Sequence, residues 1–259
     1  MKQIPLDIGL VPRPRLDTWV AGSNAQVLAH VQQLVTHPLA TAAPTYIWGD
    51  EGSGKTHLLL GALQELQEQG LTAGWLDADT ICSGYVREFD PRWSAVFMDD
   101  VDLYNDEQQH TAFNWFINAM APLQGEPRWV LAAGSLPVTD LPLREDLRTR
   151  LGWGQVYALQ PLGDDDVRAA LRRAAAERGI VLSDEVLHFM LKRFSRDLGS
   201  LNELLGMLDG YSLETRRNIT IPLLKQMLHE TRTLPCLTST IPCCRSTMTT
   251  PGRASPTRS

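Results

Sequence analysis

One glycine-rich segment of the chain has the residue types and spacing of a phosphate-binding loop. The sequence GDEGSGKT, from Gly49 to Thr56, matches the pattern G-x-x-x-x-G-K-[ST] in full. In such a loop the glycines let backbone N–H groups turn toward phosphate oxygens, and the N-terminus of the following helix favours negative charge. Lys55 is then expected to reach the β- and γ-phosphates, and the Thr56 hydroxyl to bind Mg²⁺. The alternative, a chance glycine-rich turn, is disfavoured because a strand is expected before the motif and a helix after it.

Two aspartates end an apolar segment further along the chain. Asp99 and Asp100 follow the sequence AVFM. At such a place one carboxylate can hold the Mg²⁺ shell, and a second can orient a water molecule for attack on the γ-phosphate. Alone, the pair would be interpreted as solvated acids in a turn, but a complete phosphate loop in the same chain favours the functional interpretation. Asp102 and Asp106 are expected to be merely exposed acids.

Further polar residues lie where strands or helices are expected to end. Ser135 follows an apolar segment, where its hydroxyl could sense a γ-phosphate, and a simple turn serine is nearly as good an interpretation. Arg150 ends a short amphipathic segment and Arg196 has the same ambiguity, because arginines near helix C-termini are common for dipole reasons alone. Trp153 is expected to pack rather than to recognise a ligand. The histidines are scattered and form no metal-binding constellation.

The first part of the chain alternates short apolar segments with amphipathic ones. This alternation predicts an α/β fold in which a parallel sheet is covered by helices on both faces. The segment at 155–161 closes this part. The expected strands lie at 45–48, 73–79, 94–100 and 128–135, and the expected helices at 56–70, 106–121 and 143–151.

After Pro161 the pattern becomes helical throughout. Apolar stripes recur at helical spacing, and Ser183 is expected to cap one of the helices. Residues 163–230 therefore predict a small all-helical domain attached to the α/β core. Residues 231–259 are rich in Ser, Thr and Pro and lack acidic residues, so we expect a disordered tail or a non-native extension. The expected helices of this domain lie at 164–179, 183–194, 198–211 and 221–230.

The composition is that of a globular protein with a modest acidic charge. Apolar residues make up 43% of the 259 residues and the formal net charge is −6, which argues against broad non-specific binding to DNA. The four cysteines give neither a disulfide framework nor paired zinc spacing. No apolar run reaches the length of a membrane span, and the N-terminal residues, interrupted by Pro5, Asp7 and Gly9, do not form a signal-peptide core. We therefore expect a cytoplasmic protein without membrane contact.

Together these motifs resemble the AAA+ family, in its branch around the bacterial replication initiator DnaA. The similarity covers residues 17–230 and implies a P-loop NTPase core over 17–162 with a helical lid over 163–230. The matching segments are WVAGSN before the nucleotide site, GSGKTHLL as Walker A, MDDVD as Walker B, LRTRLGWG as the arginine-finger box and SRDLGSLNELL as the sensor-2 helix.

The resemblance implies ADP or ATP with Mg²⁺ as cofactors, and a role for each matching residue. Asp99 and Asp100 serve Walker B, with Thr56 and Asp99 at the metal. Ser135 falls at the sensor-1 position, which is the loosest assignment, and Arg150 at the arginine finger. The residues implied to bind nucleotide are Val20, Asn24, Gly49, Gly52, Gly54, Lys55, Thr56, His57 and Arg196, the last at sensor 2.

The DnaA initiator continues past its lid into a basic helix-turn-helix domain, whereas residues 231–259 have no helical pattern. This short form resembles the Hda family, the regulatory inactivators of DnaA, whose members carry an N-terminal peptide that binds the sliding clamp, the beta subunit of DNA polymerase III. The sequence QIPLDI is similar to that peptide, and residues 1–16 are the expected clamp-binding peptide and linker. Leu6 and Ile8 would enter a hydrophobic pocket while Gln3 makes polar contacts, and Pro5 lowers the entropy cost of the extended form.

The resemblance implies an adaptor that docks on the DNA-loaded clamp and reaches DNA only through it. There it would stimulate hydrolysis of DnaA-bound ATP through Arg150, which regulates initiation negatively at the nucleoid or replisome. Weak intrinsic ATPase activity and homo-oligomers are compatible with this role. A self-sufficient ATPase that remodels or loads a replication protein is the first alternative and would turn over ATP in an Asp100-dependent way. A DNA-binding initiator variant is the second, and the acidic net charge argues against it.

Overall fold

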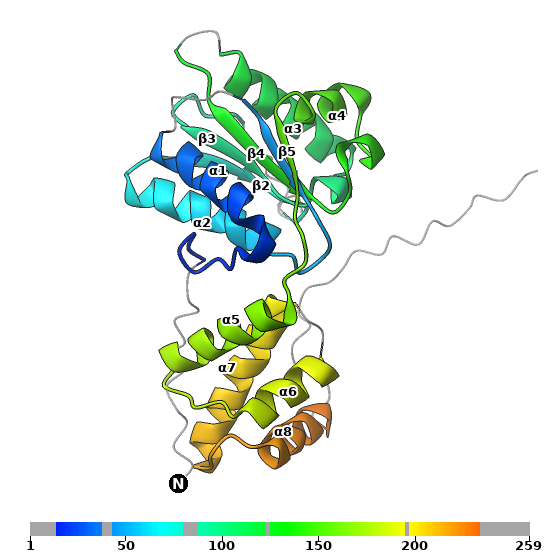
Figure 1. The fold of residues 1–259 in the computed structure, drawn as a ribbon. Coiled ribbons are helices and arrows are strands. Elements are labelled where there is room, and N and C mark those ends of the chain that lie inside the picture. Colours follow the sequence, from blue (N-terminus) through cyan, green and yellow to red (C-terminus); the bar gives the residue numbers. More distant parts are fainter. Residues whose placement is uncertain (1–13, 38–42, 80–87, 123–124, 195–196, 234–259) are drawn as a thin grey trace, which may run out of the picture.

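The computed structural model describes residues 14–37, 43–79, 88–122, 125–194 and 197–233 (Figure 1). The predicted clamp-binding residues Gln3, Leu6 and Ile8, the sensor-2 candidate Arg196 and nearly all of the predicted tail lie outside these ranges. Predictions about them remain untested by the structure.

A parallel sheet of five strands forms the centre of the first domain, in the order β2-β3-β4-β1-β5. This confirms the predicted α/β fold. Apart from Thr45, the residues of the inner strands are apolar, as expected where both faces of a sheet are covered, whereas β5 is an exposed edge strand. The strands are β1 Thr45–Trp48, β2 Ala73–Leu76, β3 Ala95–Met98, β4 Trp129–Gly134 and β5 Gln155–Ala158.

Helices cover the two faces of this sheet, as Figure 1 shows. On one face α1 (Ala25–Thr36) and α2 (Lys55–Glu68) pack on alternate strand residues such as Ile47 and Leu131. On the other face α3 (Asp106–Met120) and α4 (Glu145–Leu151) pack on the intervening residues, among them Tyr46. The alternation of side chains along each strand thus divides the core into two apolar layers.

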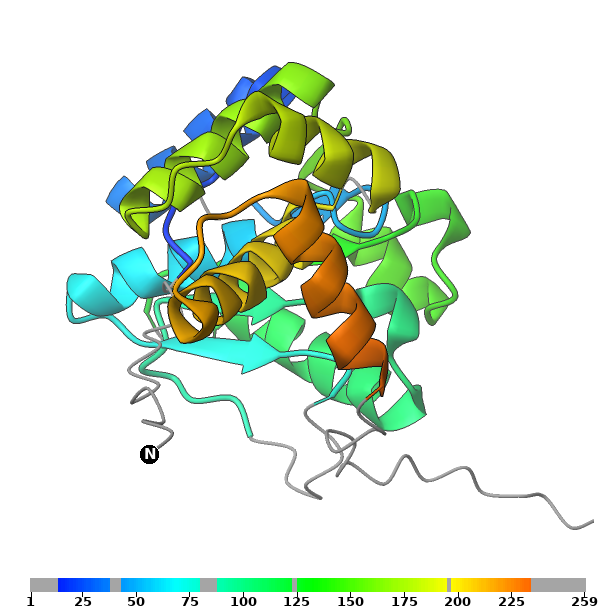
Figure 2. The ribbon, with the colours of Figure 1, turned by 90° about the horizontal axis from the view of Figure 1, so that it is seen from below.

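The second domain is a lid of helices with its own apolar core. Leu171, Met190, Leu201 and Leu224 meet in a cluster separate from those of the sheet. The Ser183 side chain accepts a hydrogen bond from the Val186 N–H and so caps α6 as predicted. In the view from below, α8 crosses beside α7 (Figure 2). The lid helices are α5 Asp164–Glu177, α6 Asp184–Arg193, α7 Leu198–Thr215 and α8 Ile221–Thr233, the last running past the predicted boundary at Glu230.

The segment that precedes α1 joins the core to the lid. The Asn24 amide, only 4% exposed, donates to the Gln160 carbonyl oxygen at 2.9 Å and accepts from the Gln160 N–H at 2.7 Å. A Cβ placed on Gly22 would lie 2.8 Å from Leu162 Cδ2 and 3.1 Å from the Asp166 carboxylate. The start of α5 therefore lies directly against the segment before α1.

Candidate functional site

The carboxyl ends of three adjacent strands bring most of the predicted site residues together. The phosphate-loop motif follows β1, Asp99 follows β3 and Ser135 follows β4. Because Trp48 is paired with Gly134 in a parallel register, the loop and Ser135 leave the sheet side by side. Ligands of open parallel sheets bind outside this edge, so the topology alone gathers these residues around one place.

The loop from Gly49 to Thr56 turns at two of its glycines. Gly52 and Gly54 have φ values of 76° and 90°, a left-handed conformation in which a side chain would be strained. A Cβ on Gly54 would also lie 2.9 Å from the indole nitrogen of Trp19, which donates a 3.0 Å hydrogen bond to the Gly54 carbonyl oxygen. The glycines thus create a close-packed turn that leads directly into α2.

Lys55 lies inside this loop. Its side chain is only 6% exposed, and Nζ donates to the carbonyl oxygens of Gly49 at 2.8 Å and Asp50 at 3.0 Å. An ammonium group has three N–H donors, so one remains for a ligand oxygen. The Ser53 hydroxyl is buried and has no hydrogen-bond partner among the described residues. Spare donors in a left-handed glycine turn at a helix N-terminus fit a chain of phosphates.

Asp99 lies next to this loop and is 2% exposed. Burial raises its pKa to about 6, against the lowering effect of a hydrogen bond from the Thr56 hydroxyl, while the neighbouring Asp100 carboxylate raises it further. The Asp100 N–H donates to Asp99 Oδ1 at 3.1 Å, and the ammonium of Lys55 also favours the ionised form. A carboxylate and a threonine hydroxyl in contact beside a phosphate loop are oxygen ligands of the kind that Mg²⁺ takes. Thr56 and Asp99 therefore fit the predicted metal position.

Asp100 has a strained backbone. Its φ of 48° and ψ of 46° are left-handed, which is uncommon for residues other than glycine but tolerated by aspartate. Burial raises the pKa of its carboxyl, the ammonium of Lys55 lowers it, and the carboxylates of Asp102, Asp79 and Asp77 raise it again. Backbone strain of this kind is concentrated at functional sites, which agrees with a task for Asp100 at the end of β3.

Asp102 is not the exposed acid that the sequence predicted. It is partly buried, and its carboxylate accepts a 2.8 Å hydrogen bond from the backbone N–H of Ser135. A Cβ on Gly134 would lie 2.8 Å from the same oxygen and 2.6 Å from the Tyr46 hydroxyl. Asp102 therefore fixes the turn that carries the sensor-1 candidate. Asp106 is exposed, as predicted.

The lid contributes Asp197 to the surroundings of the loop. A Cβ on Gly52 would lie 2.7 Å from both Cβ and Oδ1 of Asp197, so the N-terminus of α7 touches the phosphate loop. Partial burial raises the pKa of Asp197, but hydrogen bonds from the Ser200 hydroxyl and from the backbone N–H groups of Ser200 and Gly199 outweigh it, so the pKa is lowered overall. The loop thus lies between the sheet edge and the lid.

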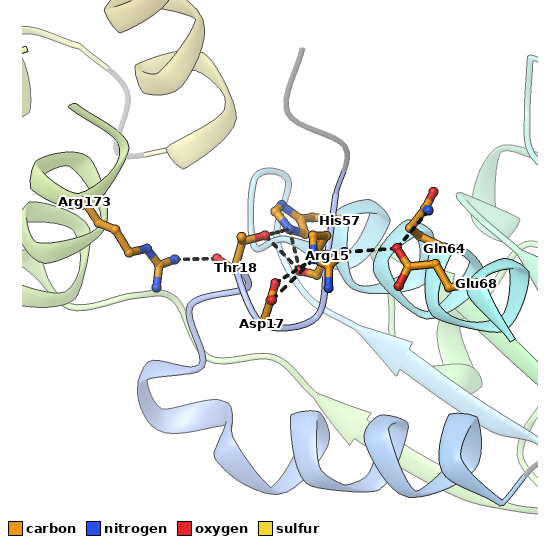
Figure 3. A network of polar contacts seen from close by, with 7 residues as sticks. All are labelled: Arg15, Asp17, Thr18, His57, Gln64, Glu68 and Arg173. Carbon is orange, nitrogen blue, oxygen red and sulfur yellow. Dashed lines mark hydrogen bonds and ion pairs between the residues drawn. The ribbon is translucent and has the colours of Figure 1, made fainter. Parts of the chain in front are cut away.

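A polar network joins the segment before α1 to both domains (Figure 3). The Arg173 guanidinium of α5 donates to the Thr18 carbonyl oxygen at 2.6 Å. His57 Nε2 lies 3.2 Å from both Thr18 Oγ1 and the Arg15 carbonyl oxygen, and Thr18 Oγ1 donates to that carbonyl at 2.9 Å. Because both neighbours of Nε2 can accept, a protonated Nε2 satisfies the geometry. Burial lowers the pKa of His57, the Arg15 carbonyl raises it and Arg173 lowers it, and the pKa is lowered overall.

Three further residues were predicted to bind nucleotide, and only one of them lines a hollow. Val20 lines a small hollow of about 230 Å³ between this segment and α5, with Asp166, Ala169, Ala170 and Arg173. His57 and Asn24 instead form hydrogen bonds with other protein groups. These bonds fix segments that lie next to the loop, a role that the motif alone did not indicate.

Arg150 lies on another part of the surface, in the last turn of α4. Its guanidinium carbon is 5.3 Å from the ring centroid of Phe113 and 4.8 Å from that of Trp153. The hollow beside it measures about 490 Å³ and is lined by Arg144, Glu145, Asp146, Thr149, Arg150 and Trp153. Trp153 was expected to pack, yet 64% of its surface is exposed. It covers Arg150 rather than the core.

Two family models match the chain. The bacterial DnaA ATPase domain matches residues 10–158, and the Hda lid domain matches residues 164–228. The first match alone spans more than half of the 259 residues. The chain belongs to the bacterial DnaA ATPase-domain family. Its lid is of the Hda type, and the boundary between the two matches coincides with the start of α5.

Relatives of this DnaA-family chain support the same architecture. An uncharacterized protein of Haemophilus influenzae is 33% identical over 235 residues, which cover 88% of this chain and 99% of that protein. Domain III of the Thermotoga maritima replication initiation protein DnaA superposes with a TM-score of 0.71 at 19% identity, over 85% of this chain and 97% of that one. AMPPCP-bound DnaA from Aquifex aeolicus gives 0.61 at 20% identity, over 76% and 66% of the two chains. The two structural similarities concern the fold.

Some surroundings of this DnaA-family site could not be found from sequence motifs. Asp102 and Asp197 lie within the matching segments MDDVD and SRDLGSLNELL, but the motifs do not indicate the contacts that these carboxylates form, and Arg173 lies in none of the motifs. Within the described ranges, no group of three or more His, Cys, Asp and Glu side chains could hold a metal ion by itself. A metal would thus depend on Thr56, Asp99 and ligand oxygens together. No helix in those ranges is both long and apolar enough to span a membrane.

Proposed function

We propose that the chain binds ADP or ATP with Mg²⁺ between its sheet edge and its lid. The left-handed glycines, the buried Lys55 and the contact between Thr56 and Asp99 support this proposal. Bound Mg²⁺ would neutralise charge on the phosphate oxygens. Lys55 would use its remaining N–H donor on a phosphate, and Asp197 with its segment of the lid would cover the loop. Aquifex aeolicus DnaA, which has the same fold, binds AMPPCP.

The bound chain would act as a negative regulator of replication initiation, by stimulating hydrolysis of ATP on DnaA. In this proposal Arg150 reaches the ATP of DnaA in trans and stabilises charge on the transferring phosphoryl group, an effect worth about 10³–10⁵ in rate in related enzymes. The supporting observation is that Arg150 lies beside a surface hollow of about 490 Å³ and takes part in no ion pair among the described residues. Its donors are therefore available to a partner.

The chain would reach DNA indirectly, through the sliding clamp. Gln3, Leu6 and Ile8 carry this part of the proposal, and they lie outside the described residues. The double substitution Gln3→Ala with Leu6→Ala is expected to abolish retention on immobilised clamp. Ile4→Ala, within the same hexapeptide but outside the motif, is the matched control. Equal retention of the double variant and the wild type would show that another surface binds the clamp.

The deciding measurement is hydrolysis of DnaA-bound ATP in the presence of DNA-loaded clamp. Arg150→Ala is expected to reduce stimulation to the level of DnaA alone. Arg148→Ala, on the same helix, removes the same charge and is expected to retain stimulation. Full stimulation by Arg150→Ala would refute the proposed role in trans.

A self-sufficient ATPase is a second candidate function, favoured by one observation. Thr56, Asp99, Asp100 and Ser135 lie at one edge of the chain's own sheet, so the groups needed for hydrolysis of its own ATP are gathered there. This function requires turnover by the chain alone that is lost in Asp100→Asn. In the adaptor role, Asp100→Asn leaves stimulation of DnaA largely intact.

A further inference from the structure

The side chain of Arg150 is held by two aromatic rings from different segments. Phe113 belongs to α3 and lies 5.3 Å from the guanidinium carbon, and Trp153 follows α4 and lies 4.8 Å away. Both distances are within the range in which a guanidinium is attracted to the face of a ring. The cation is thus restrained from the side of the core and from the side of the surface.

The exposure of Trp153 is unusual for so large an apolar side chain. An indole that is 64% exposed contributes little to the core, and Trp153 belongs to neither apolar cluster of the α/β domain. Its ring contact with Arg150 is the feature of its surroundings that depends on an aromatic side chain. Trp153 is therefore better placed to position Arg150 than to stabilise the fold.

A neighbouring arginine shows what distinguishes Arg150. Arg144 also lies over the Phe113 ring, at 5.8 Å, but its guanidinium forms a 2.9 Å ion pair with Asp146. Arg150 has two ring contacts and no ion pair within the described ranges. A guanidinium that is held by ring contacts rather than by a carboxylate keeps its N–H donors for a phosphate.

We propose that Trp153 and Phe113 are positioning residues that hold the Arg150 guanidinium ready to contact the phosphates of a nucleoside triphosphate bound by the partner protein. This inference rests on the proposed function of Arg150. A free arginine side chain loses much rotamer entropy when it is fixed, and the two rings fix it before the partner arrives. The rings would therefore raise the rate of phosphoryl transfer and not the affinity for the partner, because they need not contact the partner themselves.

The test measures the maximal rate and the half-saturating concentration separately, in hydrolysis of DnaA-bound ATP. Trp153→Ala is expected to lower the maximal stimulated rate by about 3- to 30-fold, the range that a cation–π contact supports, with the half-saturating concentration unchanged. Trp153→Tyr keeps an aromatic face and is expected to restore most of the rate. Phe113→Leu keeps an apolar side chain of similar size without the ring and should lower the rate in the same way. Leu213→Ala, at a 67% exposed position on the lid, is the control.

A double-variant cycle separates positioning from direct contact with the partner. The readout in an Arg150→Ala background is binding to ATP-bound DnaA on DNA-loaded clamp, and adding Trp153→Ala is expected to leave this affinity unchanged. An unchanged maximal rate in Trp153→Ala, or a loss of affinity for DnaA when Trp153→Ala is added to Arg150→Ala, would overturn the inference. Either result leaves the proposed function intact as long as Arg150→Ala itself abolishes stimulation. Full stimulation by Arg150→Ala would instead remove the proposed function.

Discussion

At the scale of single residues, Asp99 combines burial with charge. Its pKa rises from 3.8 to about 6 because burial penalises the ionised form. A folded-state pKa above the unfolded value means that the fold favours the protonated carboxyl. The resulting stability is fully present below pH 3.8 and is lost as the pH rises through about 6. At neutral pH, without a bound cation, the ionised carboxylate costs on the order of 3 kcal/mol.

We therefore expect Asp99→Asn to be more stable than the wild type at pH 8 by about 1–3 kcal/mol, and to lose this advantage at pH 4. The same variant is expected to lose Mg²⁺-dependent binding of ATP, because an amide is a poorer ligand for the cation. Urea unfolding at the two pH values measures the first effect, and ATP titration with and without Mg²⁺ the second. Asp140→Asn, at an exposed position, is the control. Equal stability gains at pH 4 and pH 8 would contradict the assigned pKa.

The residues of the site differ in how far sequence could predict them. Lys55 and Thr56 lie in one contiguous motif, and Asp99 ends an apolar strand, so local patterns locate all three. Asp102 looks like any acid in a turn, and only the tertiary structure places its carboxylate on the Ser135 N–H. Asp197 meets Gly52 from the lid for the same reason. Contacts between distant segments leave no local pattern.

At the scale of elements, α1 was the helix that sequence analysis did not predict. Val27, Val31, Leu34 and Val35 have helical spacing and are buried, but valine is a weak helix former because of its branched Cβ. The residue at its start is of a type that commonly caps helices, but it does not do so here. Asn24, the N-cap residue, forms no side-chain cap because its amide bonds to Gln160. Packing on the sheet, not local preference, determines this helix.

α3 is the opposite case, because its start is specified locally. The Asn105 side chain accepts hydrogen bonds from the N–H groups of Glu107 and Gln108, and the Gln108 side chain accepts one from the Asn105 N–H. Asn105→Ala is expected to lower the free energy of unfolding by about 1 kcal/mol, measured by urea denaturation. Asn105→Ser should retain most of it. Asn114→Ala, exposed in the middle of the same helix, should not be destabilised. A loss equal to that of Asn105→Ala at this control position would rule out the capping explanation.

At the scale of the whole molecule, the segment before α1 connects the lid to the phosphate loop. Arg173 on α5 donates to the Thr18 carbonyl oxygen, and the next residue, Trp19, donates to the Gly54 carbonyl oxygen. The Thr18 hydroxyl also contacts His57, in the first turn of α2. Lid and loop are thus joined by consecutive residues of one short segment. We infer that holding the lid in place also holds the loop in its binding conformation.

Arg173→Ala is accordingly expected to weaken binding of ADP by roughly fivefold, since it removes one charged hydrogen bond at an exposed position, worth about 1 kcal/mol. The matched control is Arg172→Ala at the preceding position, because Arg172 pairs with Asp184 inside the lid and does not reach the core. Titration of a fluorescent ADP derivative measures both affinities. If both variants bind ADP like the wild type while their unfolding is unchanged, the loop keeps its conformation without the lid contact. A loss confined to Arg173→Ala means instead that the lid and the nucleotide site act as one unit through Thr18 and Trp19.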